Sequence, residues 1–342
     1  MDLLHLTDLC NRYALDKTRA FPVLSGFSVL RRETESDIEA VIYEPVFCLI
    51  LQGSKVTSIG EQVVELGPGD ALLVSHDLPV VSRVTRASSQ DPYLALILRL
   101  DLGLLRGLYD QVADVPLPDG DARSLSAGPV EPALLASLVR YLELLLEPRD
   151  VKVLGPTIRR EIHYRLLLSS RGRMLRELLV SDSHASRIAK AIQRVRAEFH
   201  TPLAIADLAK AAGMSASSFH EHFKAVTGTT PLQYRKDLRL IAARALLVEK
   251  NLTVSEAAYA VGYESPTHFS RDYSRKFGSP PGRDARAKRD CRRDAAPGFS
   301  LCREDMGPAT VRRVEDSGYK IASCLIDAGA EDLASLLDRR AP

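Results

Sequence analysis

The chain has 342 residues, which is enough for two or three domains with sizeable cores. Its hydrophobic share of 45% and charged share of 26% are ordinary for a soluble globular protein. No apolar run reaches the roughly 18 residues of a membrane span, and the N-terminus lacks the basic start and cleavage site of a signal peptide, so we expect a cytoplasmic protein.

The charge is unevenly distributed along the chain. The net charge of +2 by itself says nothing about nucleic acid. Residues 181–290, however, contain 18 Lys and Arg against 11 Asp and Glu, whereas the rest of the chain is acidic. A basic segment joined to an acidic remainder is typical of phosphate binding by one domain only.

The N-terminal half changes from helix to strand. Residues 1–25 predict an amphipathic helix or arm that packs on the next domain. Residues 26–115 are rich in short β segments separated by turn residues, a pattern typical of a small barrel or sandwich. The expected strands are FSVLRR, AVIYEP, FCLILQGSKVTSIG, QVVEL, DALLVS, PVVSRVT and YLALILRL.

Within this β region, LGPGDALLVSHDLPVVSRV resembles the cupin pattern. Metal-binding cupins supply several histidines and a glutamate, but this segment has a single histidine, and the five cysteines form no CxxC pair. We therefore expect no metal, no cofactor and no catalytic residue, but a pocket for one small effector. The strand residues that could contact the effector, with ordinary packing or solvent exposure open for each, are Tyr43, Phe47, Gln52, His76 and Arg83.

Residues 116–180 predict helices after a turn-rich start. A leucine stripe at i, i+3/i+4 and i+7 marks a helix over residues 132–147. Pro148 and Pro156 separate it from a second helix that begins at Pro156. These helices either cover an open face of the barrel or pair with the same helices of a second subunit.

A repeated pattern marks residues 181–287. Residues 205–228 and 254–278 each place a short Ala-rich helix before a glycine, a small polar cap and a second helix. The glycines, Gly213 and Gly262, can take the positive φ of a sharp turn, and the caps are Ser215 and Ser265.

The second helices of the two copies share an aromatic stripe but not an exposed face. Phe219 and Phe223 correspond to Phe269 and Tyr273, at the i, i+4 spacing of an inward face. Two hairpins of an ordinary helical bundle would need neither the matched glycines nor the matched aromatic pairs. The repeat therefore indicates two helix-turn-helix units, whose second helices can enter the major groove of DNA.

At these residues the chain resembles the AraC/XylS family of bacterial transcription regulators. The resemblance is carried by LAKAAGMSASSFHEHFKAVTGTTPLQYRKDLRLIAARALL and AAYAVGYESPTHFSRDYSRKFGSPP, and the β segments VIYEPVFCLILQGSKV and DPYLALILRLD look like an N-terminal effector domain of that family. The resemblance implies a long linker helix over residues 231–249. It also implies promoter activation more often than repression.

The resemblance assigns roles to the exposed positions of the second helices. Those implied to read bases are Ser217, His220, Glu221, Thr267, His268 and Arg271. An arginine can bond guanine bidentately, and a glutamate can accept from cytosine N4. The basic side chains assigned to phosphates, which fix register without reading sequence, are Lys224, Arg239, Arg275 and Lys276.

The sequence thus predicts an α+β multidomain protein, with a cupin-like β-barrel and helices followed by an all-α domain of two helix-turn-helix units. We expect an effector-controlled regulator with promoter DNA, a second copy of itself and RNA polymerase as partners. An architectural DNA binder without effector, and a cupin-type enzyme fused to a DNA-binding domain, stay open as alternatives. Residues 288–342 form a charged tail without a motif.

Overall fold

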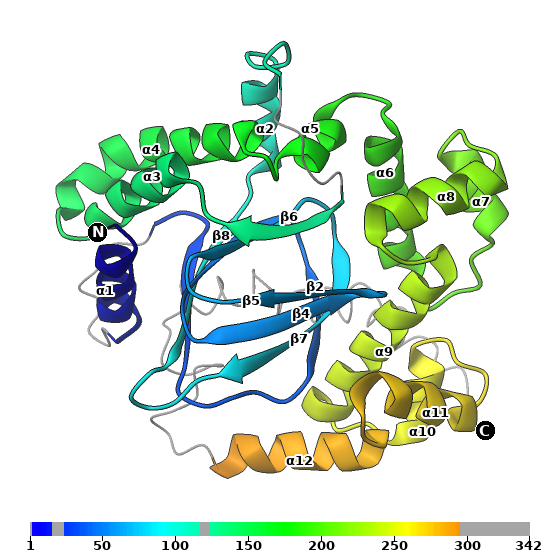
Figure 1. The fold of residues 1–342 in the computed structure, drawn as a ribbon. Coiled ribbons are helices and arrows are strands. Elements are labelled where there is room, and N and C mark those ends of the chain that lie inside the picture. Colours follow the sequence, from blue (N-terminus) through cyan, green and yellow to red (C-terminus); the bar gives the residue numbers. More distant parts are fainter. Residues whose placement is uncertain (1, 16–23, 117–122, 295–342) are drawn as a thin grey trace. The chain divides into compact units, whose positions relative to one another are not determined.

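The computed structural model describes residues 2–15, 24–116 and 123–294 (Figure 1). These described residues form two compact units, one within residues 2–39, 43–189 and 222–228, the other within residues 40–42, 190–221 and 229–294. All described strands lie before residue 130 and only helices follow, which confirms the α+β multidomain class. Most of the tail predicted at residues 288–342 lies outside the described residues.

The strands form two sheets in place of the single barrel that the sequence predicted. The five-stranded sheet has the order β1-β8-β3-β6-β9 and the four-stranded sheet the order β2-β7-β4-β5. Within them, β3 pairs antiparallel with β6 and β8, and β4 pairs antiparallel with β5 and β7. The strands are β1 (Phe27–Arg32), β2 (Glu39–Tyr43), β3 (Val46–Gln52), β4 (Ser54–Ile59), β5 (Gln62–Leu66), β6 (Asp70–Val74), β7 (Leu78–Arg86), β8 (Tyr93–Arg99) and β9 (Leu125–Pro129).

One glycine separates the two sheets. The segment FCLILQGSKVTSIG, expected as one strand, is divided at Gly53 into β3 and β4, which belong to different sheets. Gly53 has a φ of +74°, and a Cβ there would lie 2.5 Å from the carbonyl oxygen of Arg86 and 2.8 Å from the Cα of Tyr93. Only glycine allows this crossing, because any side chain would meet backbone atoms.

Helices cover one face of the five-stranded sheet. Leu94, Leu96 and Leu98 of β8 point to this face and join one core with leucines of α1, α3 and α4. Figure 1 shows α3 and α4 side by side along the sheet. The helices are α1 (Asp2–Leu15), α2 (Leu102–Tyr109), α3 (Pro132–Glu143), α4 (Pro148–Leu168) and α5 (Arg173–Leu179).

Two sequence-based boundaries in this region were wrong. Pro156 does not begin a helix but lies inside α4, which begins at Pro148, where a missing N–H costs no helical hydrogen bond. Strand β9 was not expected, because LSAGP has little strand character; it pairs with β6 and extends the sheet beyond residue 115. The helices of residues 116–180 share the core of the sheet.

Between residues 184 and 294 the regular elements are all helices, and they follow the repeat read from the sequence. Gly213 and Gly262 take φ values of +64° and +83° at the two turns. The linker helix is α9, with the bounds that the family resemblance implied. The helices are α6 (His184–Glu198), α7 (Ile205–Ala211), α8 (Ala216–Thr227), α9 (Pro231–Glu249), α10 (Val254–Ala260), α11 (Pro266–Phe277) and α12 (Pro281–Asp294).

Candidate nucleic-acid interface

The two reading helices, α8 and α11, begin at the predicted serine caps. Ser215 Oγ accepts from the backbone N–H of Ser218 at 3.2 Å, and Ser265 Oγ accepts from that of His268 at 3.4 Å. These bonds satisfy N–H groups that have no partner inside the helix. In both helix-turn-helix units a serine side chain therefore caps the start of the reading helix.

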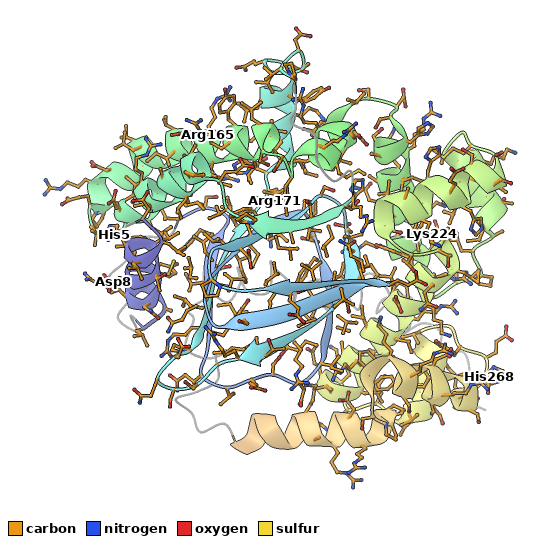
Figure 2. All side chains as sticks on the ribbon, viewed as in Figure 1. His5, Asp8, Arg165, Arg171, Lys224 and His268 are labelled. Carbon is orange, nitrogen blue, oxygen red and sulfur yellow. The ribbon has the colours of Figure 1, made fainter. Side chains whose placement is uncertain are left out.

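Each reading helix buries its aromatic stripe and exposes its polar side. The side chains of Phe219, Phe223, Phe269 and Tyr273 are completely buried, as the repeat predicted. All six residues with an expected base-reading role are exposed, namely Ser217, His220, Glu221, Thr267, His268 and Arg271. Figure 2 labels His268 on α11 and Lys224 on α8.

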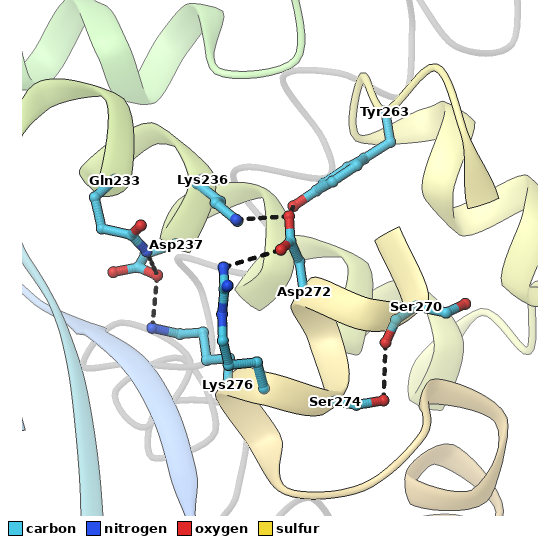
Figure 3. Close-up of polar contacts among 9 residues, drawn as sticks. Gln233, Lys236, Asp237, Tyr263, Ser270, Asp272, Ser274 and Lys276 are labelled. Atoms are coloured by element: carbon cyan, nitrogen blue, oxygen red, sulfur yellow. Dashed lines mark hydrogen bonds and ion pairs between the residues drawn. The ribbon is translucent and has the colours of Figure 1, made fainter. Parts of the chain in front are cut away.

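Ion pairs hold α11 against the linker helix α9 (Figure 3). Lys236 Nζ lies 2.6 Å from Asp272 Oδ2, and Lys276 Nζ lies 2.8 Å from Asp237 Oδ1. Asp237 also accepts from Gln233 Nε2 at 3.0 Å. The two pairs run in opposite directions, one cation on each helix, so they resist both sliding and rotation of α11 along α9.

Arg239 of α9 holds the turn of the second helix-turn-helix unit. Its guanidinium donates to the carbonyl oxygens of Phe199 at 2.7 Å and Gly262 at 2.8 Å, with longer bonds to those of His200 and Thr201. Its pKa is lowered by partial burial and by the nearby charge of Arg235. Arg239 thus joins the end of α6, the linker helix and the turn before α11.

These contacts involve two of the side chains that were expected from the sequence to contact phosphates. Lys276 forms an ion pair with Asp237, and Arg239 donates to backbone carbonyl oxygens, so both side chains already have partners within the protein. Lys224 is exposed, and Arg275 is 67% exposed with one pair to Asp272. Lys224 and Arg275 therefore keep a geometry that suits phosphate contact.

A buried ion pair joins α12 to the linker helix α9, next to the second helix-turn-helix unit. The guanidinium of Arg244 contacts both carboxylate oxygens of Asp284, at 2.8 and 2.9 Å. Tyr273 of α11 donates its hydroxyl to Asp284 Oδ2 at 2.7 Å. This bidentate geometry suits arginine and gives the reading helix a second attachment.

The five residues proposed from the sequence to line an effector pocket do not meet in one place. Phe47 lies in the core under the helices, and Gln52 donates to Asp91 at 2.6 Å. Arg83 is exposed on β7, where it lies 3.5 Å from Glu35. Only Tyr43 reaches a polar group between the sheets.

His76 is a structural histidine. Nδ1 lies 2.9 and 3.0 Å from the hydroxyls of Ser75 and Ser124, and Nε2 lies 3.2 Å from the carbonyl oxygen of Ala185. Burial lowers its pKa to about 4. Its ring nitrogens are occupied by protein partners, so it offers neither to a metal or a ligand.

Sequence reasoning missed a polar cluster between the two sheets. Lys55 of β4 is 7% exposed, and its Nζ donates to the hydroxyl of Tyr43 at 3.0 Å. The charge of Lys55 lowers the pKa of Cys48 and Tyr93, although burial raises both pKa values more strongly. The alternation in SKVTSI could have revealed it, because Lys55, Thr57 and Ile59 share the buried face.

Two helix-turn-helix units with buried aromatic stripes and exposed polar faces define a DNA-binding transcription regulator. Residues 23–174 match the family model described as AraC-type transcriptional regulator N-terminus, and residues 208–287 match a helix-turn-helix domain model. The chain belongs to the AraC/XylS family of transcriptional regulators.

Curated relatives carry the same class of activity in their names. The chain is 24% identical to the HTH-type transcriptional regulator ExsA of Pseudomonas aeruginosa, over 71% of this chain and 87% of ExsA. It is 34% identical to the HTH-type transcriptional activator RhaS of Escherichia coli, over 45% of this chain and 53% of RhaS. It is 36% identical to the transcriptional activator NphR of a Rhodococcus species, over 30% of this chain and 31% of NphR.

Among solved structures, ToxT from Vibrio cholerae O395 aligns with a TM-score of 0.49 and 13% identity, covering 76% of this chain and 98% of ToxT. None of the helices in the described ranges has the length and apolar composition that a membrane span requires.

Proposed function

We propose that this regulator reads two short blocks of promoter DNA, one with α8 and one with α11. The observation that carries the proposal is the exposure of six polar residues on these helices above buried aromatic stripes. Ser217, His220 and Glu221 would read the first block, and Thr267, His268 and Arg271 the second. Tandem units on one chain suit two major-groove contacts about one helical turn apart.

Arg271 carries the most specific of these roles. It is exposed, and none of the described side chains forms an ion pair with it, so its guanidinium is free to bond O6 and N7 of a guanine. Glu221 would accept from cytosine N4, and Lys224 and Arg275 would contact phosphates. Because α11 is held to α9 by two ion pairs, Arg271 would meet the groove without a large ordering cost.

Selection of bound sequences from random duplex DNA, at two salt concentrations, tests this proposal. We expect a motif of two short blocks separated by about one helical turn. The Arg271→Ala variant should lose preference in one block and keep it in the other. Recovery of no motif, with binding that falls steeply with salt, would leave only phosphate attraction and overturn the proposal.

The two N-terminal sheets, which we call the N-terminal sandwich, would control DNA binding by taking up a small effector. An effector acts by binding more tightly to the arrangement that docks on DNA, so its effect cannot exceed that difference in affinity. We propose activation of transcription through RNA polymerase, in the cytoplasm where promoter DNA lies, and no enzymatic reaction. RhaS and NphR, which carry the word activator in their names, support this direction.

The regulator would act as a homodimer through the connection between α3 and α4. Three exposed apolar side chains lie close together in sequence here, Leu146 in the connection itself and Val153 and Leu154 in the first turns of α4. Burying them against a second copy would remove them from water. Equilibrium sedimentation that finds only monomer well above micromolar concentration would overturn the dimer.

A further inference from the structure

The space between the two sheets contains a cation without a counter-charge. Lys55 alternates with half-buried neighbours along β4 and turns toward the five-stranded sheet, where its charge acts on Cys48 and Tyr93. In the part of the chain that the structure describes, no carboxylate forms an ion pair with it, and its one hydrogen-bond partner is the hydroxyl of Tyr43. An ammonium has three donors, so two of them have no protein acceptor.

The neighbours of Lys55 do not supply a negative charge. Burial raises the pKa of the Tyr93 phenol and of the Cys48 thiol above their ordinary values, so both groups stay neutral near pH 7. The ring of Tyr43 lies 5.3 Å from Lys55 Nζ and offers only its π face. A buried ammonium with neutral partners costs several kcal/mol, which is a liability unless a ligand brings the anion.

Two further polar atoms in the same layer have no partner. The hydroxyls of Tyr93 and Thr57 are buried without any hydrogen bond, and both residues are completely buried. Thr57 lies two residues after Lys55 on the same face of β4, and Tyr93 begins β8 beside the Gly53 crossing. The Lys55 ammonium and the hydroxyls of Thr57 and Tyr93 therefore bring donors without a protein acceptor into the interior from both sheets.

Apolar side chains lie beside these polar groups. Ile50 of β3 and Ala95 of β8 are completely buried and lie opposite each other in the sheet register. They alternate with the leucines that form the core under the helices, so they face the opposite side of the sheet, toward Lys55. A ligand here would meet the Lys55 ammonium and the two hydroxyls beside these apolar side chains, whereas Arg32, whose charge also acts on Tyr93, is already paired with Glu39 at 2.7 Å.

We propose that Lys55, Tyr93 and Thr57 form the head-group site of the effector, and that the effector is a small monocarboxylate with an apolar body. The carboxylate would pair with the Lys55 ammonium and accept from the two hydroxyls, filling acceptor positions that the protein leaves empty. A single lysine matches a single negative charge, whereas a phosphate dianion would call for an arginine fork or a second cation. This inference rests on the proposed function, because it names the ligand of the sandwich.

The probe is the straight-chain series hexanoate, octanoate and decanoate, with the primary alcohol of each length as the neutral counterpart. Binding is measured on the full-length chain by the rise in Tm with ligand concentration. We expect the carboxylates to bind more tightly than the alcohols, and each added methylene to tighten binding about fourfold. A carboxylate series that leaves Tm unchanged overturns the proposal.

Lys55→Met tests the cation. We expect its dissociation constant for octanoate to rise about tenfold or more, since a hydrogen bond to a charged group is lost, while octan-1-ol binds as before. Arg83→Met is the matched control, because Arg83 is paired in register with Val56 and lies on the outer face of the same sheet. Equal octanoate binding by both variants and the parent chain overturns the site.

The stability of the Lys55→Met variant in the absence of ligand tells whether Lys55 serves a ligand or stabilises the fold. Lys55→Met should be at least as stable as the parent chain, because a buried unpaired cation is replaced by an apolar side chain of similar length. Should that variant not fold, Tyr93→Phe removes only an unpartnered hydroxyl; it should leave Tm unchanged and weaken octanoate binding about threefold or more. A Tyr93→Phe variant that binds octanoate as tightly as the parent overturns the role of Tyr93.

The DNA-selection experiment keeps this inference distinct from the proposed function. A two-block motif recovered from a chain that ignores carboxylates would leave the regulator intact and remove the Lys55 site. Lys55-dependent octanoate binding without any DNA motif would leave the site intact and overturn the DNA-reading proposal. A two-block motif together with Lys55-dependent octanoate binding supports both proposals. In that case octanoate should change operator affinity in the parent chain but not in Lys55→Met.

Discussion

A side chain at position 262 would collide with His200. An ideal Cβ built on Gly262 would lie 2.1 Å from the carbonyl oxygen of His200, and Gly262 has a φ of +83°. The same carbonyl accepts from Arg239, so the backbone near the end of α6 cannot move away without breaking the bonds that hold the turn. The glycine of the second helix-turn-helix unit is therefore required by close approach as well as by backbone conformation.

We predict that Gly262→Ala lowers the free energy of unfolding by about 3 kcal/mol or more, since backbone strain and a collision with backbone add together. Gly278→Ala is the matched control. Gly278 also has a positive φ, of +73°, but a Cβ there would meet nothing within 4 Å, so only about 1 kcal/mol is expected. Urea unfolding of both variants checks this, and equal losses would show that the His200 contact is unimportant.

The pair between Lys276 of α11 and Asp237 of α9 gives a second prediction. The two side chains are 12% and 10% exposed, so removing one partner leaves a charge nearly buried. Asp237→Asn should cost about 2 to 3 kcal/mol of stability and weaken specific DNA binding through the altered seat of α11. The double variant Asp237→Leu with Lys276→Met should recover most of the stability, because no unpaired charge is left.

Arg275→Met is the control for the stability measurement alone, because Arg275 is itself assigned a phosphate contact. It removes the exposed partner of Asp272, which keeps its ion pair with Lys236, so a loss below about 1 kcal/mol is expected. An Asp237→Asn variant as stable as Arg275→Met would contradict the role that we assign to the buried pair.

The local features of the DNA-binding part could be predicted from the sequence. Gly262, the cap Ser265 and the stripe of Phe269 and Tyr273 follow from spacing within a few residues, and the repeat supplies an internal control for each. The exposed positions of α8 and α11 could be predicted from the same helical periodicity. Such features depend on backbone conformation and helix geometry, which short stretches of sequence encode directly.

The partners of charged side chains could not be predicted, because they lie far away in sequence. Arg239 bonds Phe199 and Gly262, which lie 40 and 23 residues from it, and a basic residue on a helix facing DNA suggested a phosphate contact instead. The division of the strands at Gly53 depends on backbone of β7 and β8 that local sequence does not encode. The alternation in SKVTSI places Lys55 on the buried face of β4, but its contacts with Tyr43 and Tyr93 could not be predicted for the same reason, since they come from other strands.

Base reading and phosphate contact predict different DNA-binding behaviour. Arg271→Ala should lose roughly 1 to 3 kcal/mol against the preferred site, with relaxed preference at one base pair and little change on random DNA. Arg275→Ala should weaken specific and random DNA alike and reduce the salt slope by about one. Fluorescence anisotropy on both kinds of duplex, over a range of salt, distinguishes them; the same loss on both duplexes for Arg271→Ala would contradict base reading.

The last prediction concerns pH and starts from a buried histidine under α2. His163 Nε2 accepts from the backbone N–H of Asp101 at 3.0 Å, and Nδ1 lies 2.7 Å from the carbonyl oxygen of Arg159, to which it donates. Burial is the main cause that lowers the pKa of His163 from 6.5 to about 4, with a smaller contribution from the charge of Arg159. Protonation would add a charge to this buried site and place a donor against the N–H of Asp101.

The sign follows from the two pKa values. Above pH 6.5 neither the folded nor the unfolded chain protonates His163, so its contribution to stability is fully present. As the pH falls from 6.5 toward 4, the unfolded chain takes up a proton that the folded chain refuses, and about 3 kcal/mol is lost. Asp101, whose pKa is lowered chiefly by the bond from the N–H of Leu104, acts only below its ordinary value of 3.8.

We therefore expect the free energy of unfolding to fall between pH 6.5 and pH 4, with His76 adding a loss of the same sign because its pKa is also about 4. His163→Gln should flatten this dependence, since glutamine accepts and donates without taking up a proton. His268→Gln, at an exposed position on α11, should leave the slope as it is. Urea unfolding at half-unit steps of pH measures the slope, and a His163→Gln variant with the full loss would show that another group controls acid stability.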